Sequence, residues 1–375
     1  MNRILVVRPD RIGDVVLSSS FLRELRRTFP HAWITLIVRP SVYGLVELCP
    51  YVNEVLRYDG EAQGRFWRLR LHARALALCW NFLWKRRFDL AILPRWDADF
   101  FHSTFLAYWS GARRRVGFSE NVSSAKKKIN KGYDRLLTDA VEDCEVKHEL
   151  EHNLDWIRYL GGEVVDRSPE LWIGPEDRAF ADEFLRGHGI HPGDFMIGLG
   201  PGSRAPKKEW PRDRFAELGK WLQERFQARI LLLGGAKEKS LGVDLSERIG
   251  LACLNAAGQM TLRQSAALLE RCSFYIGNDS GPAHMAAAAG IPLVVFSCHP
   301  ENGPDASFYS PVRIGPYSSN CTIIRPKNFR PPCEGSCAAD RPHCILGISL
   351  HSVQKVVAAH WEESPVWTRQ QNPLR

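Results

Sequence analysis

The residues best suited to bind phosphate lie between 278 and 284. A buried apolar run at 274–277 leads into the polar turn 278–282, with the sequence Asn-Asp-Ser-Gly-Pro, and then into an alanine-rich segment that contains His284. This order is typical of a strand, a tight turn and a helix with proline at its first position. The amides of Ser280 and Gly281 would form a phosphate or diphosphate site at the positive end of the helix dipole. The alternative is a helix cap that serves stability alone.

Two further loops in the same half have suitable chemistry. In the loop 198–211, small residues would let the backbone approach a ligand, while Arg204, Lys207 and Lys208 could offset charge on a departing phosphate. The loop 234–238 could offer Glu238 to ribose hydroxyls. Loops at the carboxyl ends of parallel strands share one edge of a sheet, so together they predict a nucleotide-diphosphate pocket. The sequence has neither a P-loop nor the Gly-x-Gly-x-x-Gly fingerprint of dinucleotide-binding proteins.

A candidate general base lies in the first half. Gly13-Asp14 follows the first apolar run, so Asp14 is expected to project into a cleft between two domains and to accept a proton from an incoming hydroxyl. Asp10 is a nearby competitor, and Asp14 could instead complement a helix N-terminus. Asp97-Ala98-Asp99 resembles a metal-binding Asp-x-Asp motif, but we interpret it as a surface loop because two carboxylates at this spacing are common.

The elements that position these loops alternate between strand and helix. Such alternation predicts parallel sheets with right-handed crossovers, hence an α/β fold. At about 150 residues per domain, 375 residues suggest two domains, and we place the boundary near 165–175. The expected strands are 3–7, 33–38, 88–93, 195–199, 229–233, 274–277 and 293–297, and the expected helices are 66–84, 212–226, 240–249, 262–271 and 282–289.

Composition and charge restrict the class of protein. With 45% hydrophobic and 25% charged residues the chain resembles a soluble globular protein. Its longest apolar run, 285–297, is shorter than the roughly 20 residues of a membrane-spanning helix, and the run 4–7 is too short for a secretory signal, so we expect a cytoplasmic protein. The net charge of the chain is +8. Residues 61–135 hold 16 Lys and Arg against 6 Asp and Glu, so this segment alone carries +10. Such a cationic surface would attract anionic partners, although the same charges could simply be solvated faces of helices.

Two segments leave alternatives open. Residues 66–87 interleave aromatic and basic side chains, which suits either an anionic membrane surface or a sheet-covering helix with charged ends. Near the C-terminus Cys333, Cys337 and Cys344, with Cys321 upstream and His343 adjacent, could form a structural zinc or iron site. Their spacing is looser than Cys-x-x-Cys, so free thiols or a redox-sensitive pair remain equally open.

Motifs spread in order over nearly the whole chain resemble glycosyltransferase family 9, the ADP-heptose:lipopolysaccharide heptosyltransferases. The matching motifs are Gly13-Asp14, Ser110-Gly111-Ala112 with Arg115-Val116-Gly117-Phe118, His148-Glu149-x3-Asn153, Pro201-Gly202-Ser203 with Lys208-x-Trp210-Pro211, and Gly277-Asn278-Asp279-Ser280-Gly281-Pro282 with His284.

The resemblance implies an inverting glycosyltransferase that moves a heptose from ADP-heptose to a hydroxyl of a lipopolysaccharide inner-core acceptor, with Asp14 as general base and Lys208 assisting. It implies two Rossmann-like domains facing across a cleft, of the glycosyltransferase B type. Residues 1–170 would bind the acceptor, residues 171–350 would bind the nucleotide sugar, and a C-terminal helix and tail at 351–375 would pack back toward the N-terminal domain.

The resemblance also assigns the binding residues. Lys208, Ser280 and Gly281 would hold the diphosphate, Asp279 the sugar hydroxyls, Glu238 the ribose and Met260 the adenine. The complete donor set is Ser203, Arg204, Lys208, Glu238, Met260, Asp279, Ser280, Gly281 and His284. The acceptor set is Arg11, Arg115, Lys126 and Lys127.

The expected partners follow from the same resemblance. They are a nucleotide-sugar donor, an anionic glycolipid acceptor and the inner leaflet of the cytoplasmic membrane, to which the enzyme would bind peripherally, and not nucleic acid. No cofactor would be required, although a divalent cation such as Mg²⁺ could stimulate the reaction. The alternatives are a family member that uses another nucleotide sugar or a protein acceptor, and a nucleotide-sugar epimerase of the same architecture, since fold alone does not separate these activities.

Overall fold

A computed structural model describes residues 1–61, 65–335 and 338–363 and divides the chain into two compact units. The first unit holds Met1–Gly174 together with Val312–Tyr317, and the second holds Pro175–Pro311 and the residues from Ser318 onward. The break after Gly174 lies inside the segment where the sequence placed a boundary. The return of Val312–Tyr317 to the first unit was not expected from the sequence.

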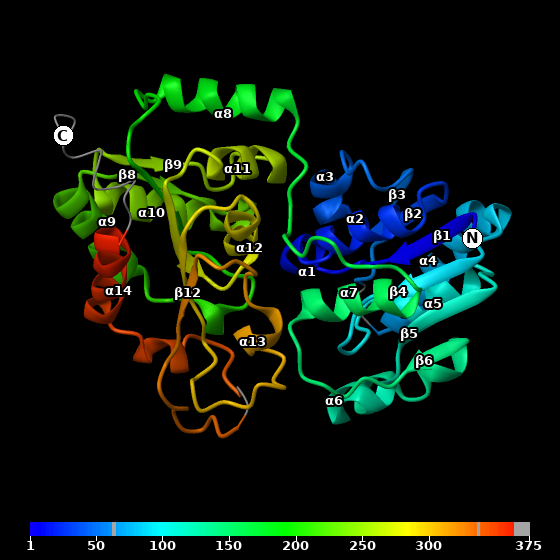
Figure 1. Cartoon of the computed structure of the whole chain (residues 1–375). Coiled ribbons are helices and arrows are strands. Elements are labelled where there is room, and N and C mark those ends of the chain that lie inside the picture. The colour runs from blue at the N-terminus through cyan, green and yellow to red at the C-terminus, as the bar shows by residue number, and fades with distance from the viewer. Residues whose placement is uncertain (62–64, 336–337, 364–375) are drawn as a thin grey trace. The chain divides into compact units, whose positions relative to one another are not determined.

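The first unit is built on a six-stranded parallel sheet (Figure 1). Leu5 and Val7 point to one face and pack with Ala75 and Leu106 from two covering helices, α4 and α5. On the other helical layer α2 packs against α7. In spatial order the strands are β3 (Glu54–Arg57), β2 (Trp33–Val38), β1 (Arg3–Val7), β4 (Leu90–Leu93), β5 (Arg114–Phe118) and β6 (Asp139–Val141). The helices are α1 (Ile12–Val16), α2 (Ser19–Thr28), α3 (Tyr43–Val46), α4 (Trp67–Leu78), α5 (Ser103–Trp109), α6 (Ser124–Asn130), α7 (Glu149–Tyr159) and α13 (Pro311–Ile314).

The second unit repeats this plan with another six-stranded parallel sheet. Its core joins the sheet to α9, α10 and α14, while α8 and α12 both pack against α11. In spatial order the strands are β12 (Cys321–Ile324), β11 (Leu293–Phe296), β10 (Phe274–Asn278), β7 (Met196–Gly200), β8 (Arg229–Leu232) and β9 (Cys253–Asn255). The helices are α8 (Pro175–Gly187), α9 (Arg212–Phe226), α10 (Lys239–Ile249), α11 (Leu262–Leu269), α12 (Gly281–Ala288) and α14 (Leu350–Glu363).

Both sheets have the strand order of a doubly wound Rossmann fold. In each unit the chain first builds three strands in one direction, then returns and builds three in the other, which places a switch point between β1 and β4 and another between β7 and β10. The prediction of an α/β protein with two Rossmann-like units is therefore confirmed. In open α/β sheets ligands bind beyond the carboxyl ends of the strands at such points.

The C-terminal helix α14 is part of the second unit. Its residues Val353 and Val357 are buried in the core of that unit. The reason is its apolar face, which continues the core that α9 begins. Residues 364–375 of the expected tail lie outside the described residues. Within the described part of the chain, no helix is long and apolar enough to cross a membrane.

Candidate active site

At the switch point of the second unit, the loop after β7 is tied to the loop after β10 by one buried side chain. Asn278, the last residue of β10, donates from Nδ2 to the Pro201 carbonyl oxygen at 2.6 Å. Its Oδ1 accepts a hydrogen bond from the Trp210 backbone N–H at 3.0 Å. Both ends of the loop 201–210 are thereby fixed by the strand that leads into the candidate phosphate turn.

This tie brings Lys208 to Asp279. The Lys208 ammonium lies 2.6 Å from Asp279 Oδ2, and the side chains are 14% and 4% exposed. Burial opposes the charge of Lys208, but Asp279 outweighs that effect and raises the pKa of the lysine. Burial likewise opposes the charge of Asp279, yet Lys208, followed by His284 with Nε2 3.7 Å away, holds the pKa of the carboxyl well below its usual value. Lys208 and Asp279 therefore form a largely buried ion pair between the loop 201–210 and the end of β10.

The N-terminus of α12 lies directly after this carboxylate. Ser280 is its N-cap residue with an extended backbone, and the helix begins at Gly281, so Pro282 is its second residue and not its first as the sequence predicted. The Asp279 amide donates to the Phe296 carbonyl oxygen at 3.0 Å, so the turn is anchored to β11. The Ser280 and Gly281 amides therefore lie at the positive end of an eight-residue helix, directly after the residue whose carboxylate pairs with Lys208.

The sequence suggested that small residues in the loop 198–211 let the backbone approach a ligand. In the structure, two of its glycines have a packing role instead. A Cβ at Gly200 would lie 1.9 Å from the Tyr275 hydroxyl oxygen. A Cβ at Gly202 would lie 2.3 Å from Cγ of Glu238. These glycines make room for protein side chains. The second contact also shows that Glu238, whose Oε2 accepts from the Gly235 N–H at 2.8 Å, lies beside the loop that carries Lys208.

The remaining donor candidates are less closely placed. Ser203 Oγ accepts from the Ala205 N–H at 3.4 Å and is part-buried, and Arg204 is exposed on the same loop. Met260 is half-buried between β9 and α11, just before the N-cap Thr261. The structure thus joins Lys208, Asp279, His284 and the α12 turn directly.

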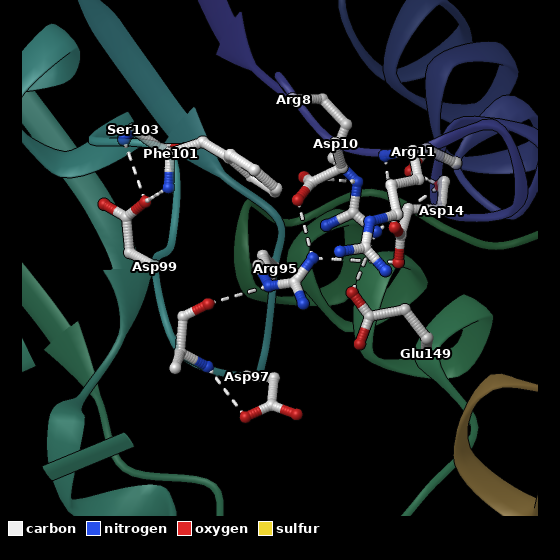
Figure 2. Close-up of polar contacts among 12 residues, drawn as sticks. Arg8, Asp10, Arg11, Asp14, Arg95, Asp97, Asp99, Phe101, Ser103 and Glu149 are labelled. Carbon is white, nitrogen blue, oxygen red and sulfur yellow. Dashed lines mark hydrogen bonds and ion pairs between the residues drawn. The ribbon is translucent and has the colours of Figure 1, made fainter. Parts of the chain in front are cut away.

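At the switch point of the first unit, two arginines and three acids form an ionic cluster (Figure 2). Arg8 donates from Nη2 to Glu149 Oε1 at 2.8 Å and lies 3.3 Å from Asp10. Arg95 lies 2.6 Å from Asp10 Oδ1 and 3.7 Å from Asp14 Oδ1. Arg8 and Asp10 follow β1, Arg95 follows β4, and Glu149 begins α7, so the cluster joins three elements that are far apart in the sequence.

The cluster distinguishes the two candidate bases. Asp10 has a 2% exposed side chain and contacts both arginines, whereas Asp14 keeps 20% of its side chain exposed and has the longer contact to Arg95. Burial raises the pKa of Asp10, although Arg95 and Arg8 act in the opposite direction. Asp14 also accepts from the Arg11 N–H at 3.2 Å through Oδ2, so it complements the start of α1 as well. Of the two, Asp14 has the more exposed carboxylate.

The Asp97–Asp99 motif is not a surface loop, and that interpretation was wrong. Asp97 is buried and paired with Arg313 at 3.0 Å. Asp99 accepts from the Phe101, Ser103 and Thr104 N–H groups and so caps the start of α5. The sequence could not show the first contact because Arg313 comes from the segment that returns from the second half of the chain.

Two of the four predicted acceptor residues are engaged within the protein. Lys126 is 4% exposed, and its ammonium donates to the Trp96 and Phe118 carbonyl oxygens at 2.8 Å each. Burial lowers the pKa of Lys126 to about 8. Arg115 donates to the Leu136 and Ala112 carbonyl oxygens at 2.8 Å each. The structure therefore assigns Lys126 and Arg115 to packing in the first unit.

Arg11 and Lys127 are exposed, and Arg11 lies beside Asp14.

Sequence reasoning missed several organising residues. Asn278 was part of the phosphate motif but was given no role, and Arg8, Arg95 and Glu149 were not recognised as partners of Asp10 and Asp14. For Arg8 and Arg95 the available signal was a charged residue within two positions of the end of a buried strand, where solvated loops are also common.

A second group of side chains could hold a metal ion. Cys333, His343 and Cys344 place their donor atoms within 4.8 Å of one another. Cys337, the third cysteine predicted for this cluster, lies outside the described residues.

Comparisons with known proteins agree with this architecture. A family model described as glycosyltransferase family 9 (heptosyltransferase) matches residues 79–339. The lipopolysaccharide core heptosyltransferase OpsX of Haemophilus influenzae is 23% identical over 328 residues, covering 86% of this chain and 83% of that protein. Lipopolysaccharide heptosyltransferase 2 of Escherichia coli is 25% identical over 348 residues, covering 86% and 88%. The crystal structure of a glycosyl transferase family 9 protein from Veillonella parvula matches with a TM-score of 0.76 at 24% identity and covers 97% of this chain and 98% of that one.

Proposed function

The chain belongs to glycosyltransferase family 9 and is a glycosyltransferase, and from this premise we propose that it transfers a heptose from ADP-heptose to a hydroxyl of a lipopolysaccharide inner-core acceptor. The named relatives are lipopolysaccharide heptosyltransferases, which supports both substrates. The observation that carries the proposal is the second switch point, where Lys208 pairs with Asp279, the residue directly before the N-cap of α12. A cation and helix amides suit a leaving diphosphate.

The donor is proposed to bind the second unit. Its diphosphate would accept hydrogen bonds from the Ser280 and Gly281 amides and from Lys208, with Ser203 and Arg204 at the same loop. An ammonium has three N–H donors, so Lys208 can keep its bond to Asp279 while it donates to phosphate. The phosphate would repel the carboxylate of Asp279 from direct contact, so Asp279 would instead accept hydrogen bonds from the sugar hydroxyls. His284 would contact the same sugar. Glu238 would accept from the ribose, and Met260 would contact the adenine.

The transfer is proposed to be a single inverting displacement. The acceptor oxygen forms a bond to the anomeric carbon while the bond from that carbon to the diphosphate oxygen breaks. Asp14 takes the proton of the acceptor hydroxyl, and ADP leaves with the electron pair. Arg95, 3.7 Å from Asp14 Oδ1, would orient the carboxylate for this step. Exposed Arg11 and Lys127 would attract the anionic acceptor.

A surface of the first unit supports peripheral binding to an anionic membrane. The segment 65–87 covers the sheet with Leu71, Ala75, Cys79 and Leu83, yet it also leaves large apolar side chains in solvent. Leu69, Trp80 and Phe82 are 66%, 63% and 48% exposed. Exposed basic residues of the same segment include Arg65, Arg70, Lys85 and Arg87. Exposed aromatic and basic side chains that alternate within one segment are a pattern by which proteins bind anionic lipid headgroups.

The transfer proposal is tested by incubating the protein with ADP-heptose and a phosphorylated lipid A-Kdo acceptor and measuring ADP release and heptosylated product. We expect ADP release only when both substrates are present. Other nucleotide sugars replace ADP-heptose in parallel reactions, and a protein acceptor replaces the glycolipid. Faster transfer from another donor, or product on the protein only, would overturn the assignment.

The membrane proposal is tested by cosedimentation with phosphatidylglycerol vesicles and with phosphatidylcholine vesicles. We expect binding to the anionic vesicles that weakens with salt, and loss of it by about tenfold in the double variant Trp80→Ser/Phe82→Ser. Val243→Ser removes an exposed apolar side chain from the second unit and is the control. Equal binding by both variants would contradict the proposal.

A further inference from the structure

The loop 325–348 of the second unit gathers two thiols and an imidazole around one point. Cys333 Sγ lies 3.6 Å from His343 Nδ1, and Cys344 Sγ lies 3.5 Å from the same nitrogen. All three donor atoms lie within 4.8 Å of one another. Both cysteines are almost fully buried, at 1% and 3% exposure, so this is not a chance meeting of surface side chains.

These distances fit a shared metal ion better than hydrogen bonds. Zinc binds sulfur at about 2.3 Å and imidazole nitrogen at about 2.0–2.1 Å, so tetrahedral geometry sets the two ligands roughly 3.6 Å apart. That is the separation found for both sulfurs. A neutral imidazole nitrogen either donates one proton or accepts one, so His343 Nδ1 cannot form a full hydrogen bond with each of two thiols.

The backbone around the cluster is organised to support thiolates. The Arg330 N–H donates to Cys344 Sγ at 3.5 Å, and the Cys333 N–H donates to the Arg330 carbonyl oxygen at 2.8 Å. The His343 carbonyl oxygen accepts from the Leu346 N–H at 3.1 Å, which fixes the backbone that carries the imidazole. Hydrogen bonds to the ligating groups orient them and tune their affinity for the ion.

We propose that Cys333, His343 and Cys344 bind a structural zinc ion. Two thiolates and an imidazole are a donor set that zinc prefers, whereas iron–sulfur clusters are held mainly by four cysteines. Among the residues that the structure describes, these three form the complete set of clustered His, Cys, Asp and Glu donors at this point. A water molecule or a further ligand would complete the tetrahedron.

The metal ion would fix the segment 344–348, which contacts the loop that carries Lys208. Cys344 opens the 3₁₀ turn Cys344–Gly347, and Ile345 and Ile348 are buried in the core of the second unit. The Ile348 carbonyl oxygen accepts from Trp210 Nε1 at 2.9 Å. Trp210 is the residue whose backbone N–H is held by Asn278, two positions after Lys208. A metal at the start of this turn would therefore stabilise the base of the Lys208 loop.

The first test is the metal content of the full-length protein, purified without chelators or a metal-affinity column and measured by plasma mass spectrometry. We expect about one zinc per chain in the wild type, and at least a fivefold loss in Cys333→Ser and in Cys344→Ser. Cys144→Ser changes an exposed cysteine elsewhere and should keep the zinc. Absence of stoichiometric metal from the wild type, one equivalent of iron instead, or full zinc in both Ser variants would overturn the proposal.

A second measurement does not depend on the folding of any variant. Zinc is removed from the wild type with a chelator and replaced by Co²⁺, which gives thiolate-to-metal charge-transfer absorption in the near ultraviolet when cysteine sulfur is a ligand. We expect that absorption, together with a lower melting temperature of the metal-free protein that recovers when zinc is restored. A cobalt spectrum without a thiolate band would refute the assignment. Neither readout involves ADP-heptose, so failure here is distinct from failure of the proposed transfer reaction.

Discussion

Replacing Lys208 by methionine removes the cation of the second switch point and leaves Asp279 without its closest partner. The two groups are 2.6 Å apart, and Asp279 is 4% exposed. His284 lies 3.7 Å from the other carboxylate oxygen and compensates only in part. We therefore expect Lys208→Met to lower the free energy of unfolding as well as the affinity for the donor.

The loss in the free energy of unfolding is limited, because an unpaired Asp279 can take up a proton. Removing one member of a buried ion pair typically costs about 3–5 kcal/mol. An uncompensated carboxyl can instead take a proton, which at pH 7 costs about 1.36 kcal/mol for each unit above its unfolded pKa of about 3.9, or about 4 kcal/mol. With partial compensation by His284, we expect a loss of about 2–4 kcal/mol at pH 7. Lys208→Met/Asp279→Asn should recover most of it, since no unpaired charge remains.

The pH dependence has a definite sign. Folding depresses the pKa of Asp279, so its stabilising contribution is present above its unfolded pKa of about 3.9 and is lost as the pH falls through the lower folded value. In Lys208→Met the effect of burial on Asp279 is no longer outweighed, so we expect the pKa of the carboxyl to rise above its unfolded value and the variant to regain stability as the carboxyl takes a proton. The difference in stability between wild type and variant should therefore shrink as the pH falls from 7 toward 4.

The assay is urea denaturation at several pH values, combined with calorimetric titration of ADP. Lys207→Met is the matched control, because it removes the same charge from the same short turn, where the ammonium lies 4.3 Å from the centre of the Tyr309 ring. The reasoning would be refuted if Lys208→Met were as stable as the control, or if the double variant were no more stable than the single one. Unchanged ADP affinity in a folded Lys208→Met would remove the lysine from the donor site.

Three further substitutions test the remaining geometry. Asp14→Asn should reduce transfer by at least about 10²-fold, as loss of a general base does, with ADP affinity unchanged; normal turnover would exclude Asp14. Asp10→Asn should instead destabilise the protein by about 2–4 kcal/mol, seen in urea denaturation, because Arg8 and Arg95 lose a buried partner. Asn278→Ala leaves two buried backbone groups unpaired and should cost about 2–4 kcal/mol with weaker ADP binding; a stable variant that binds ADP normally would show that the loop does not depend on this tie.

Local patterns in the sequence were sufficient for much of the fold. The buried strands β1, β2, β7 and β10 are continuous apolar runs between turn residues, and α9 was expected at the residues where it is found. The less apolar strands β3, β5, β6, β9 and β12 were not predicted. Four of these, β3, β6, β9 and β12, are edge strands, which are short and half-exposed and so lack the apolar signal of a strand covered on both faces. The interior strand β5 begins with two arginines, which hid its apolar second half.

The phosphate-binding turn was visible for the same local reason. A strand, a polar turn with Ser280 and Gly281, and Pro282 at the start of a helix are set by neighbours in the chain, and the structure has them within one residue of where they were predicted. The pairing of Lys208 with Asp279 needed the third dimension, because these residues are 71 positions apart and meet only when β7 and β10 become neighbours.

Sequence by itself determined the class of fold, the two units and the polar loops at the ends of the strands, because these depend on the alternation of apolar and polar residues over short distances. Tertiary structure alone decided which charged side chains are buried, which are exposed and which partners they meet. It buried Lys126 and Asp10, left Asp14 partly exposed, and joined Asp97 to Arg313, which is 216 residues away. Which charged side chains are buried, and which partners they meet, is set by the order of the strands rather than by distance in the sequence.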